Sequence, residues 1–453
     1  MKNKAMVAQP IPDREREWDE LTRHVEEVLD CARQSGADSA EAHAGMQAGI
    51  SVETRLGEVE TLEHTRDREL SVTVYVGRSK GHAGCGDLRT ESIRESVQRA
   101  VDIARFTYRD KFNGLADPER LAIEFPDLDL WHPRATDVDE AMQRALACEA
   151  AGLADERISN SEGASASSHF GLTVYGNSNG FMGRSSGTRY GQSCVLIAGQ
   201  GSTMQRDYWY DSRRVYGELE TPEQTGAEAA KRTLARLGAR QVKTAKVPVL
   251  FTAPVARSLL GNLVGAISGS ALYRNASFLK DQAGEQIFPD WFQLAELPFL
   301  PRAMGSAAFD AEGVATRERN IIERGVLTGY VLSSYSGRRL GLETTGNAGG
   351  VHNLRPLGRE LPFAQLLEEM DTGLVVTEVM GQGVSMVTGD YSRGAVGFWV
   401  EGGQLTHAVE EVTVAGNLRN MFTGIRALGD DRDDRGNIQS GSILVDGLTV
   451  AGS

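Results

Sequence analysis

The chain has 453 residues, of which 40% are hydrophobic and 24% charged, a composition typical of folded globular proteins and not of disordered ones. Single hydrophobic cores stop growing beyond about 250 to 300 residues, so at least two domains are expected. The formal net charge of -14 disfavours direct binding to nucleic acid, because that affinity depends on a basic surface.

The first half of the chain alternates between helical and strand periodicity. Residues 14–35 place apolar side chains at helical spacing and stop at Gly36, which predicts an amphipathic helix. Residues 50–65 and 68–77, with a turn at Gly57, are typical of antiparallel strands. The further predictions here are helices at 90–108, capped by Thr90, and at 138–153, strands across 158–216, and a helix at 222–237 ended by Gly238.

A polar run at 238–248, ending in Pro248, predicts the domain boundary. After it, a buried strand at 247–252 and a helix at 255–268 open a second half of short strands and glycine-rich loops. We therefore predict an α+β protein of two domains with largely antiparallel sheets and flanking helices. The predicted divisions are a flexible tail at 1–13, an N-terminal α+β domain at 14–240, and a β-rich C-terminal α+β domain at 246–453.

The cellular location is predicted from the absence of export and membrane signals. The four cysteines form no CxxC pair, which argues against a disulfide scaffold and a zinc knuckle. The first residues lack the apolar run of a signal peptide, and nowhere do about 18 apolar residues follow one another. We expect a cytoplasmic protein without a membrane partner.

The histidines do not form a helical zinc motif. No two of the eight lie within ten residues of each other, whereas a motif such as HExxH needs two imidazoles one helical turn apart. A metal site built from distant side chains stays open as an alternative. Its candidate ligands are His352, His407 and Glu401.

Two other motifs are interpreted as structural. The GNSNG run around Ser178 matches the G-x-S-x-G of a nucleophile elbow, but a Gly- and Ser-rich stretch follows it where a helix is required. An Asn-Gly hairpin turn is therefore favoured over a catalytic serine. The acidic cluster at 429–437 lacks the spacing and closing glutamate of a calcium loop, which favours a solvated loop.

The segment TTGNAGGVHNL, at 344–354, is the most unusual loop of the chain. Its glycines would let the backbone approach a ligand closely, so it could line a peptide groove, or it could simply connect two strands tightly. The residues alone leave both readings open. The candidate peptide-cleft residues are His352, Asn353, Ser392, Arg393, Glu401 and His407.

Long strings carry a family resemblance that extends over nearly the whole chain. They are LLGNLVGAISGSALYRNASFL from Leu259, the run FDAEGVATRERNIIERGVLTGYVLSSYSGRRLGLETTGNAGGVHN from Phe309, and YSRGAVGFWVEGGQLTHAVEEVTVAGNL from Tyr391. The shorter strings HFGLTVYGNSNGF, MQRDYWYDSR and GSILVDGLTVAG agree with them. Together these strings resemble the TldE/PmbA branch of the TldD/TldE family, also called the modulator of DNA gyrase family.

The resemblance implies a two-domain, PmbA/TldD-like fold and dimer formation. TldD subunits of this family are zinc peptidases with a HExxxH helix and a late cysteine ligand, and TldE subunits pair with them and lack those groups. In this chain the motif positions fall on Gly261, Asn262 and Ala266, and no cysteine follows Cys194. Glycine and alanine have no ligand atom, and an amide cannot act as a general base.

The resemblance therefore implies a non-catalytic subunit of a TldD/TldE-type zinc metallopeptidase that processes unfolded peptides. The expected partner is a TldD-type subunit that holds the zinc, with a homodimer possible when the chain is isolated and no cofactor in this chain. Two alternatives stay open. The chain could be a metallopeptidase in its own right, or a regulatory protein that affects DNA gyrase or toxin–antitoxin function through protein partners.

Overall fold

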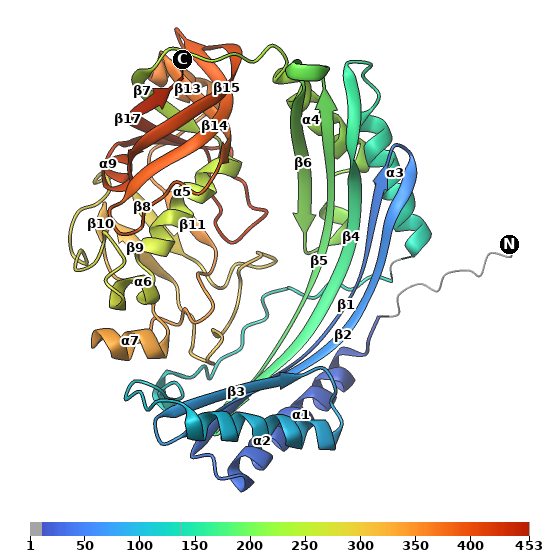
Figure 1. Cartoon of the computed structure of the whole chain (residues 1–453), viewed down its shortest axis with the longest axis vertical. Helices are drawn as coiled ribbons and strands as arrows, with labels where there is room; N and C mark the ends of the chain where they lie inside the picture. Colours follow the sequence, from blue (N-terminus) through green and yellow to red (C-terminus); the bar gives the residue numbers. More distant parts are fainter. Residues whose placement is uncertain (1–10, 136, 453) are drawn as a thin grey trace, which may run out of the picture. The chain divides into compact units, whose positions relative to one another are not determined.

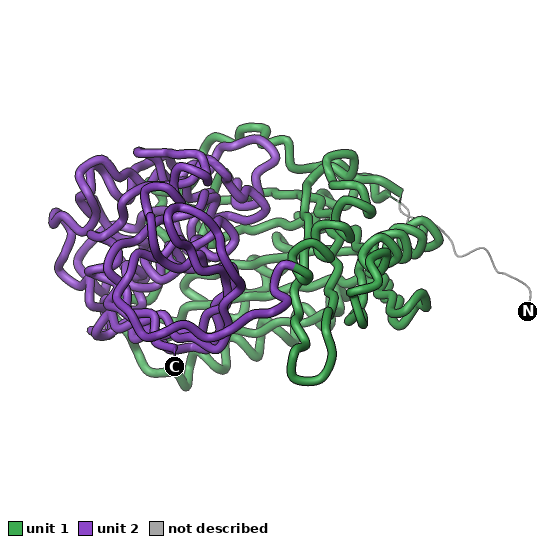
Figure 2. The backbone as a smooth tube through the Cα atoms, turned by 90° about the horizontal axis from the view of Figure 1, so that it is seen from above, with its two compact units in different colours: residues 1–234, 308–315 green, residues 235–307, 316–453 purple. Residues whose placement is uncertain are grey.

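The computed structural model describes residues 11–135 and 137–452, which form two compact units (Figures 1 and 2). The first unit comprises the described residues up to Leu234 together with Ala308–Ala315. The second comprises Ala235–Ala307 and the described residues from Thr316 onward. Residues 1–10 of the predicted flexible tail lie outside the described residues. No described helix is long and apolar enough to cross a membrane.

The first unit is one sheet covered by helices. Its elements are α1 (Arg14–Gln34), β1 (Ser39–Arg55), β2 (Glu58–Val76), β3 (Ser79–Cys85), α2 (Thr90–Phe106), α3 (Val138–Gly152), β4 (Ile158–Asn177), β5 (Met182–Ala198), β6 (Gln205–Arg213) and α4 (Pro222–Ala235). Single turns of 3-10 helix occur at Pro118–Arg120, Gly201–Thr203 and Tyr216–Glu218.

The six strands are antiparallel and follow the order β3-β2-β1-β4-β5-β6. One face of this sheet buries alternate side chains against α1, α2 and α3, which lie along its length (Figure 1). The other face carries the intermediate alternate positions, such as Ser165 and Ser167 of β4, so it is polar and partly exposed. We call it the open face of the sheet.

Local signals in the sequence explain most boundaries in this unit. Asp13 caps α1 by accepting a hydrogen bond from the Arg16 amide at 3.2 Å. The predicted Thr90 cap is wrong, because Arg89 is the N-cap of α2 and Thr90 is already the first helical residue. Arg89 is extended and makes no side-chain capping bond, so α2 owes its start to packing on the sheet and not to capping chemistry.

The GNSNG run is a hairpin turn, as predicted. It joins β4 to β5, and Gly180 has a φ of 88°, a conformation that glycine adopts without strain. The Ser178 hydroxyl oxygen accepts a hydrogen bond from the Ala40 amide at 3.0 Å, which fixes the turn against β1. Ser178 is therefore part of the fold and is not placed as a nucleophile.

The segment Ala308–Ala315 belongs to the first unit although the chain around it belongs to the second. The Ala122 amide donates to the Gly313 carbonyl at 2.9 Å, and the Ala315 amide donates to the Arg120 carbonyl at 2.9 Å. The Phe309 ring packs edge-on against Phe181, with centroids 5.3 Å apart. The sequence pattern did not predict this exchange.

The second unit is richer in strands. Its elements are β7 (Ala245–Phe251), α5 (Ala253–Ala266), α6 (Gly269–Tyr273), β8 (Gln293–Glu296), β9 (Arg319–Glu323), β10 (Val326–Leu327), α7 (Ser334–Leu340), β11 (Leu354–Leu357), β12 (Glu360–Leu361), α8 (Phe363–Met370), β13 (Gly373–Met380), β14 (Asp390–Glu401), β15 (Gln404–Asn417), α9 (Leu418–Thr423), β16 (Ile425–Gly429) and β17 (Ile443–Ala451).

Two sheets organise these strands. A four-stranded sheet has the order β10-β9-β8-β11, and a larger one runs β12-β16-β17-β15-β14-β13-β7. Because β17 also pairs with β7, strands β7, β13, β14, β15 and β17 close into a ring. Only the β13–β7 and β12–β16 strand pairs are parallel among the described strands. The predicted α+β class with largely antiparallel sheets is confirmed.

Candidate functional site

Helix α5 carries the positions that the family resemblance singles out. Its apolar side chains, among them Leu259, Leu260 and Leu263, are buried in the core of the second unit. The whole helix, APVARSLLGNLVGA, contains no His, Cys, Asp or Glu. A Cβ added at Gly261 would meet nothing within 4 Å, so space for a side chain exists there but no ligand atom does. The buried amide nitrogen of Asn262 makes no hydrogen bond.

The described residues contain no group of three or more His, Cys, Asp or Glu side chains that could hold a metal ion. The nearest sequence-based alternative was a site made of His352, His407 and Glu401. Their surroundings can be compared directly, because all three belong to the second unit.

Both ring nitrogens of His352 are already engaged by the fold. Nδ1 lies 3.2 Å from the Gly305 carbonyl oxygen and Nε2 lies 3.1 Å from the Gly346 carbonyl oxygen. Carbonyl oxygens only accept hydrogen bonds, so both contacts become hydrogen bonds only when both nitrogens carry protons. Each ring nitrogen therefore faces a backbone carbonyl oxygen and not another candidate metal ligand.

Asn353 is completely buried beside it. Its side-chain nitrogen donates to the Leu297 carbonyl at 2.9 Å and to the Ser306 hydroxyl at 2.7 Å, and its side-chain oxygen accepts from the Gly305 amide at 2.8 Å. The backbone of Asn353 has a φ of 46°, a region that asparagine tolerates better than most residues. These contacts tie the glycine-rich loop to the chain around Gly305.

An ion pair that the sequence analysis missed lies beneath the same loop. Glu296 accepts from Arg319 Nε at 2.8 Å, from the Asn347 side-chain nitrogen at 2.7 Å, and from the His352 amide at 2.9 Å. Glu296 is almost fully buried. The loop at 344–354 is thus a tight, hydrogen-bonded connection. No local pattern in the sequence distinguishes Glu296 from a surface glutamate.

The other four candidate cleft residues lie on the β14–β15 hairpin, with Ser392 and Arg393 far from its turn and Glu401 and His407 close to it. Ser392, Arg393 and Glu401 belong to β14 and His407 to β15, where His407 pairs with Trp399. Glu401 accepts from the Trp399 indole nitrogen at 3.1 Å. Burial and then the nearby Arg240 lower the pKa of His407, and Glu401 partly opposes them. None of the side-chain hydrogen bonds of His352 or Asn353 reaches this hairpin.

The acidic cluster at 429–437 is not simply solvated. Asp433 and Arg435 form a buried ion pair at 2.9 Å, and Asp431 accepts hydrogen bonds from the amide and the hydroxyl of Ser442. The expected solvated loop is therefore corrected at Asp433 and Arg435, which are buried, whereas Asp431 is exposed. The carboxylates are bound by groups of the chain itself, which agrees with rejecting a calcium loop.

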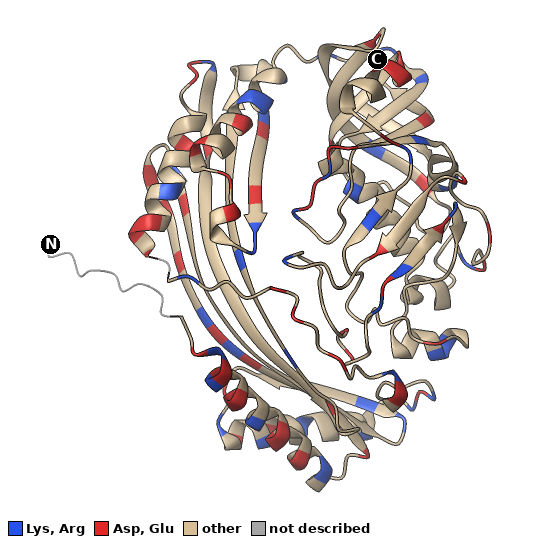
Figure 3. Ribbon diagram, turned by 180° about the vertical axis from the view of Figure 1, so that it is seen from behind, with Lys and Arg blue, Asp and Glu red and all other residues tan. Residues whose placement is uncertain are grey.

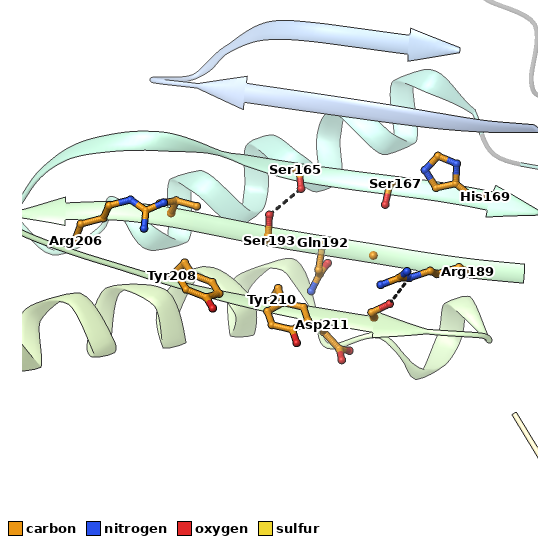
Figure 4. A pocket seen from close by; sticks show the side chains of 13 residues that line it. Ser165, Ser167, His169, Arg189, Gln192, Ser193, Arg206, Tyr208, Tyr210 and Asp211 are labelled. Carbon is orange, nitrogen blue, oxygen red and sulfur yellow. Dashed lines mark hydrogen bonds between the residues drawn. The ribbon is translucent and has the colours of Figure 1, made fainter. Parts of the chain in front are cut away.

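Two hollows lie in the first unit, on the open face of the six-stranded sheet. One has a volume of about 540 Å³ and the other of about 500 Å³. His169 of β4 and Arg189 of β5 line both. Figure 4 shows these two side chains on neighbouring strands, with Tyr208 and Tyr210 on β6. The sequence analysis did not single out any of the four.

Comparison with known families covers most of the chain. The first domain of the PmbA/TldA metallopeptidases matches residues 46–104, their central domain matches residues 131–237, and their C-terminal domain matches residues 244–452. Metalloprotease PmbA of Escherichia coli O157:H7 is 49% identical over 417 residues, which are 92% of this chain and 93% of that protein. A Metalloprotease PmbA homolog of Haemophilus influenzae is 44% identical and covers 96% of each chain.

Solved structures support the same fold. A protein of Bacteroides thetaiotaomicron, described as a candidate modulator of DNA gyrase, superimposes with a TM-score of 0.91 at 28% identity, covering 96% of this chain and 99% of its own. TldE of Thermococcus kodakarensis has a TM-score of 0.83 at 19% identity and covers 95% of this chain and 100% of its own. At that identity the second similarity concerns the fold alone.

Proposed function

This chain belongs to the PmbA/TldD metallopeptidase family, and we propose that it is the non-catalytic subunit of a two-subunit peptidase whose zinc is held by a TldD-type partner. In this assignment the chain binds unfolded peptides and helps to enclose them, while the partner cleaves them. The proposed partnership is a heterodimer, with a homodimer when the chain is isolated.

The chemistry of α5 is the observation that carries the proposal. A zinc peptidase helix needs imidazoles to hold the ion and a carboxylate to activate water. The family resemblance aligns Gly261, Asn262 and Ala266 with the motif positions, and the sequence of α5 contains no His, Cys, Asp or Glu. The residues of α5 therefore do not fit a zinc ion, and no catalytic step is assigned to this chain.

Peptide binding is proposed at the edge of the sheet in the first unit. Among the described strands β6 is the last of this sheet and pairs with β5 alone. An extended peptide can pair with such an edge through its main chain, with little dependence on its sequence. The cleft residues predicted on β14 and β15 remain a second proposed contact, since Ser392 and Glu401 are both exposed there.

Co-expression with the TldD-type protein of the same source tests the assignment. The isolated chain is expected to bind little zinc and to cleave no peptide, and the complex is expected to contain zinc and cleave unfolded peptides. The matched control is a complex in which the glutamate of the partner's HExxxH motif is replaced by glutamine, which should assemble but not cleave.

The opposite result is equally clear. If the isolated chain bound zinc in a one-to-one ratio and cleaved peptides, and if His352→Ala removed both properties, the chain would be a peptidase in its own right. Circular dichroism of His352→Ala must show native structure for this comparison, because His352 contacts two backbone carbonyls of the fold.

A further inference from the structure

A histidine and an arginine lie side by side on the open face of the first unit. His169 and Arg189 are directly opposite each other in the β4–β5 register. The position next to His169 on β1 is Gly49, where an added Cβ would lie 2.0 Å from the His169 ring, so the absence of a side chain lets the imidazole lie over that strand. Glycine is needed there for close approach and not for turn geometry.

A second cation reaches the same place from the chain after β6. Arg214 lies over Gly187 of β5, where an added Cβ would be 2.6 Å from Arg214 Nη1. The same nitrogen donates to the Thr188 carbonyl at 3.1 Å, which holds the guanidinium on the sheet. Arg214 lines the second hollow together with His169 and Arg189.

No carboxylate of the described residues pairs with Arg189. Its Nε donates to the neutral Ser212 hydroxyl at 3.0 Å, drawn as a dashed line in Figure 4. Burial, and then the charge of Arg189, lower the pKa of both Arg214 and His169. The two guanidinium groups therefore repel each other, and the lowered pKa means that the His169 imidazole loses its proton more readily than a free histidine does.

Some acidic residues of the described chain share this face, and Glu53 of β1 lies opposite Ser165, four residues along β4 from His169. Asp211, the one carboxylate lining either hollow, pairs with Arg213 at 3.0 Å. Glu63 and Asp67 face the same side of the sheet from β2, but β1 separates them from His169. Many other acidic residues of this unit lie on its helices, which cover the opposite face (Figure 3).

We propose that the open face binds the acidic side chains of an extended peptide, with a Glu or Asp carboxylate of the peptide held by Arg189, Arg214 and His169. This deepens the proposed function, on which it rests, by naming the substrate class for which the first unit is selective. A carboxylate would form charge-assisted hydrogen bonds with guanidinium groups whose planar arrangement of N–H donors matches it.

The shape and remaining lining of the hollows fit a peptide better than a small anion. The two hollows share His169 and Arg189 and follow β4 from Ser165 to Gly171, so together they form an elongated site. The Tyr208 and Tyr210 rings are stacked at 6.3 Å and provide an apolar surface along β6. The hydroxyls of Ser165 and Ser193, bonded at 2.8 Å, add polar groups for a backbone.

Fluorescence anisotropy with defined peptides tests this proposal on the isolated full chain. The probe is a labelled peptide of about eight residues, about 26 Å when extended, built of serine and glycine around a central pair of glutamates and amidated at its C-terminus. The comparison peptide has glutamines in place of the glutamates. A third peptide has the glutamines and a free C-terminal carboxylate.

The glutamate peptide is expected to bind about tenfold more tightly than the glutamine peptide, which corresponds to one or more charge-assisted hydrogen bonds. Arg189→Gln should remove most of this difference, and Arg189→Glu should reverse it in favour of a lysine peptide. Arg99→Gln is the matched control, because Arg99 is an exposed arginine of α2 that pairs with Glu95. It should leave both affinities unchanged.

Three outcomes would overturn the proposal. They are equal binding of the glutamate and glutamine peptides, an equal loss of affinity in Arg99→Gln and Arg189→Gln, and selective binding of only the peptide with a free C-terminus. The assay uses neither partner nor metal. If the chain prefers the glutamate peptide but the complex with its partner cleaves no peptide, only the proposed function is contradicted. If the complex cleaves peptides but the chain binds the glutamate and glutamine peptides equally, only this inference is contradicted.

Discussion

At the scale of single residues, Glu41 of β1 shows how burial changes the effect of a charge. Its carboxylate accepts hydrogen bonds from Tyr175 at 2.8 Å and from Tyr75 at 3.2 Å. Burial nevertheless raises the pKa of Glu41 above its usual range, and the nearby Glu312 contributes to the increase. A raised pKa in the folded state gives stability below the pKa of the unfolded chain, and this stability is lost as the pH rises through the folded pKa.

Glu41→Gln is therefore expected to raise the free energy of unfolding at pH 7, because it removes a carboxylate that is costly to ionise. The gain should disappear below about pH 4, where the carboxyl is protonated in both states. Urea unfolding at both pH values measures this. Glu53→Gln, at an exposed position of the same strand, controls for the lower net charge. A loss of stability in Glu41→Gln at pH 7 would contradict the expectation.

Asn353→Ala tests whether the end of the glycine-rich loop serves the fold. Removing the side-chain amide takes away the hydrogen-bond partner of the Gly305 amide, the Ser306 hydroxyl and the Leu297 carbonyl. In addition, alanine has a higher backbone energy than asparagine at a φ of 46°. We expect a loss of about 2–4 kcal/mol in the free energy of unfolding. Ser392→Ala, on the exposed part of β14, should change it little. An unchanged urea midpoint in Asn353→Ala would favour a purely functional role.

At the scale of elements, a glycine of a helix and a glycine of a strand have opposite roles. Gly261 lies in α5 with open space around its missing side chain, so Gly261→Ala should gain helix propensity and raise the free energy of unfolding by roughly 0.5–1 kcal/mol. Gly81 of β3 lies where an added Cβ would be 1.9 Å from the Ala100 carbonyl oxygen of α2.

Gly81→Ala should therefore separate α2 from the sheet and lower the free energy of unfolding by about 3 kcal/mol. Thermal unfolding of the two variants beside the unchanged protein measures both effects. If Gly261→Ala instead lowered the free energy of unfolding, another part of the chain or a second copy would have to occupy the space beside α5 in solution.

At the scale of the whole molecule, the segment Ala308–Ala315 connects the stability of the first unit to residues far along the chain. Phe309→Ala removes a partly buried ring from the cluster around Phe181. We expect the first unit to lose about 2–3 kcal/mol, less than for a fully buried phenylalanine. Faster hydrogen exchange of the backbone amides in β4 and β5 would measure this loss of stability. Phe106→Ala removes an exposed ring and should leave the exchange unchanged.

The local patterns of the sequence were enough to predict most elements of the first unit. Apolar spacing places α1 within a residue of its observed end, and the Asn-Gly turn chemistry predicts the β4–β5 hairpin. Both depend on interactions between residues close in the chain, which periodicity and turn preference report directly. The Thr90 cap failed because packing against the sheet, and not capping chemistry, starts α2.

By itself, the sequence determined the α+β class, the antiparallel strands but not their length, the family, and the absence of His, Cys, Asp and Glu from the segment that forms α5. Each of these depends on residue identity or local order. Only the tertiary structure decided which side chains meet. Gly49, His169 and Arg189 become neighbours through strand register, and Glu296 and His352 through a folded loop. Such pairings are fixed by contacts between residues far apart in the chain, which leave no periodic trace in the sequence.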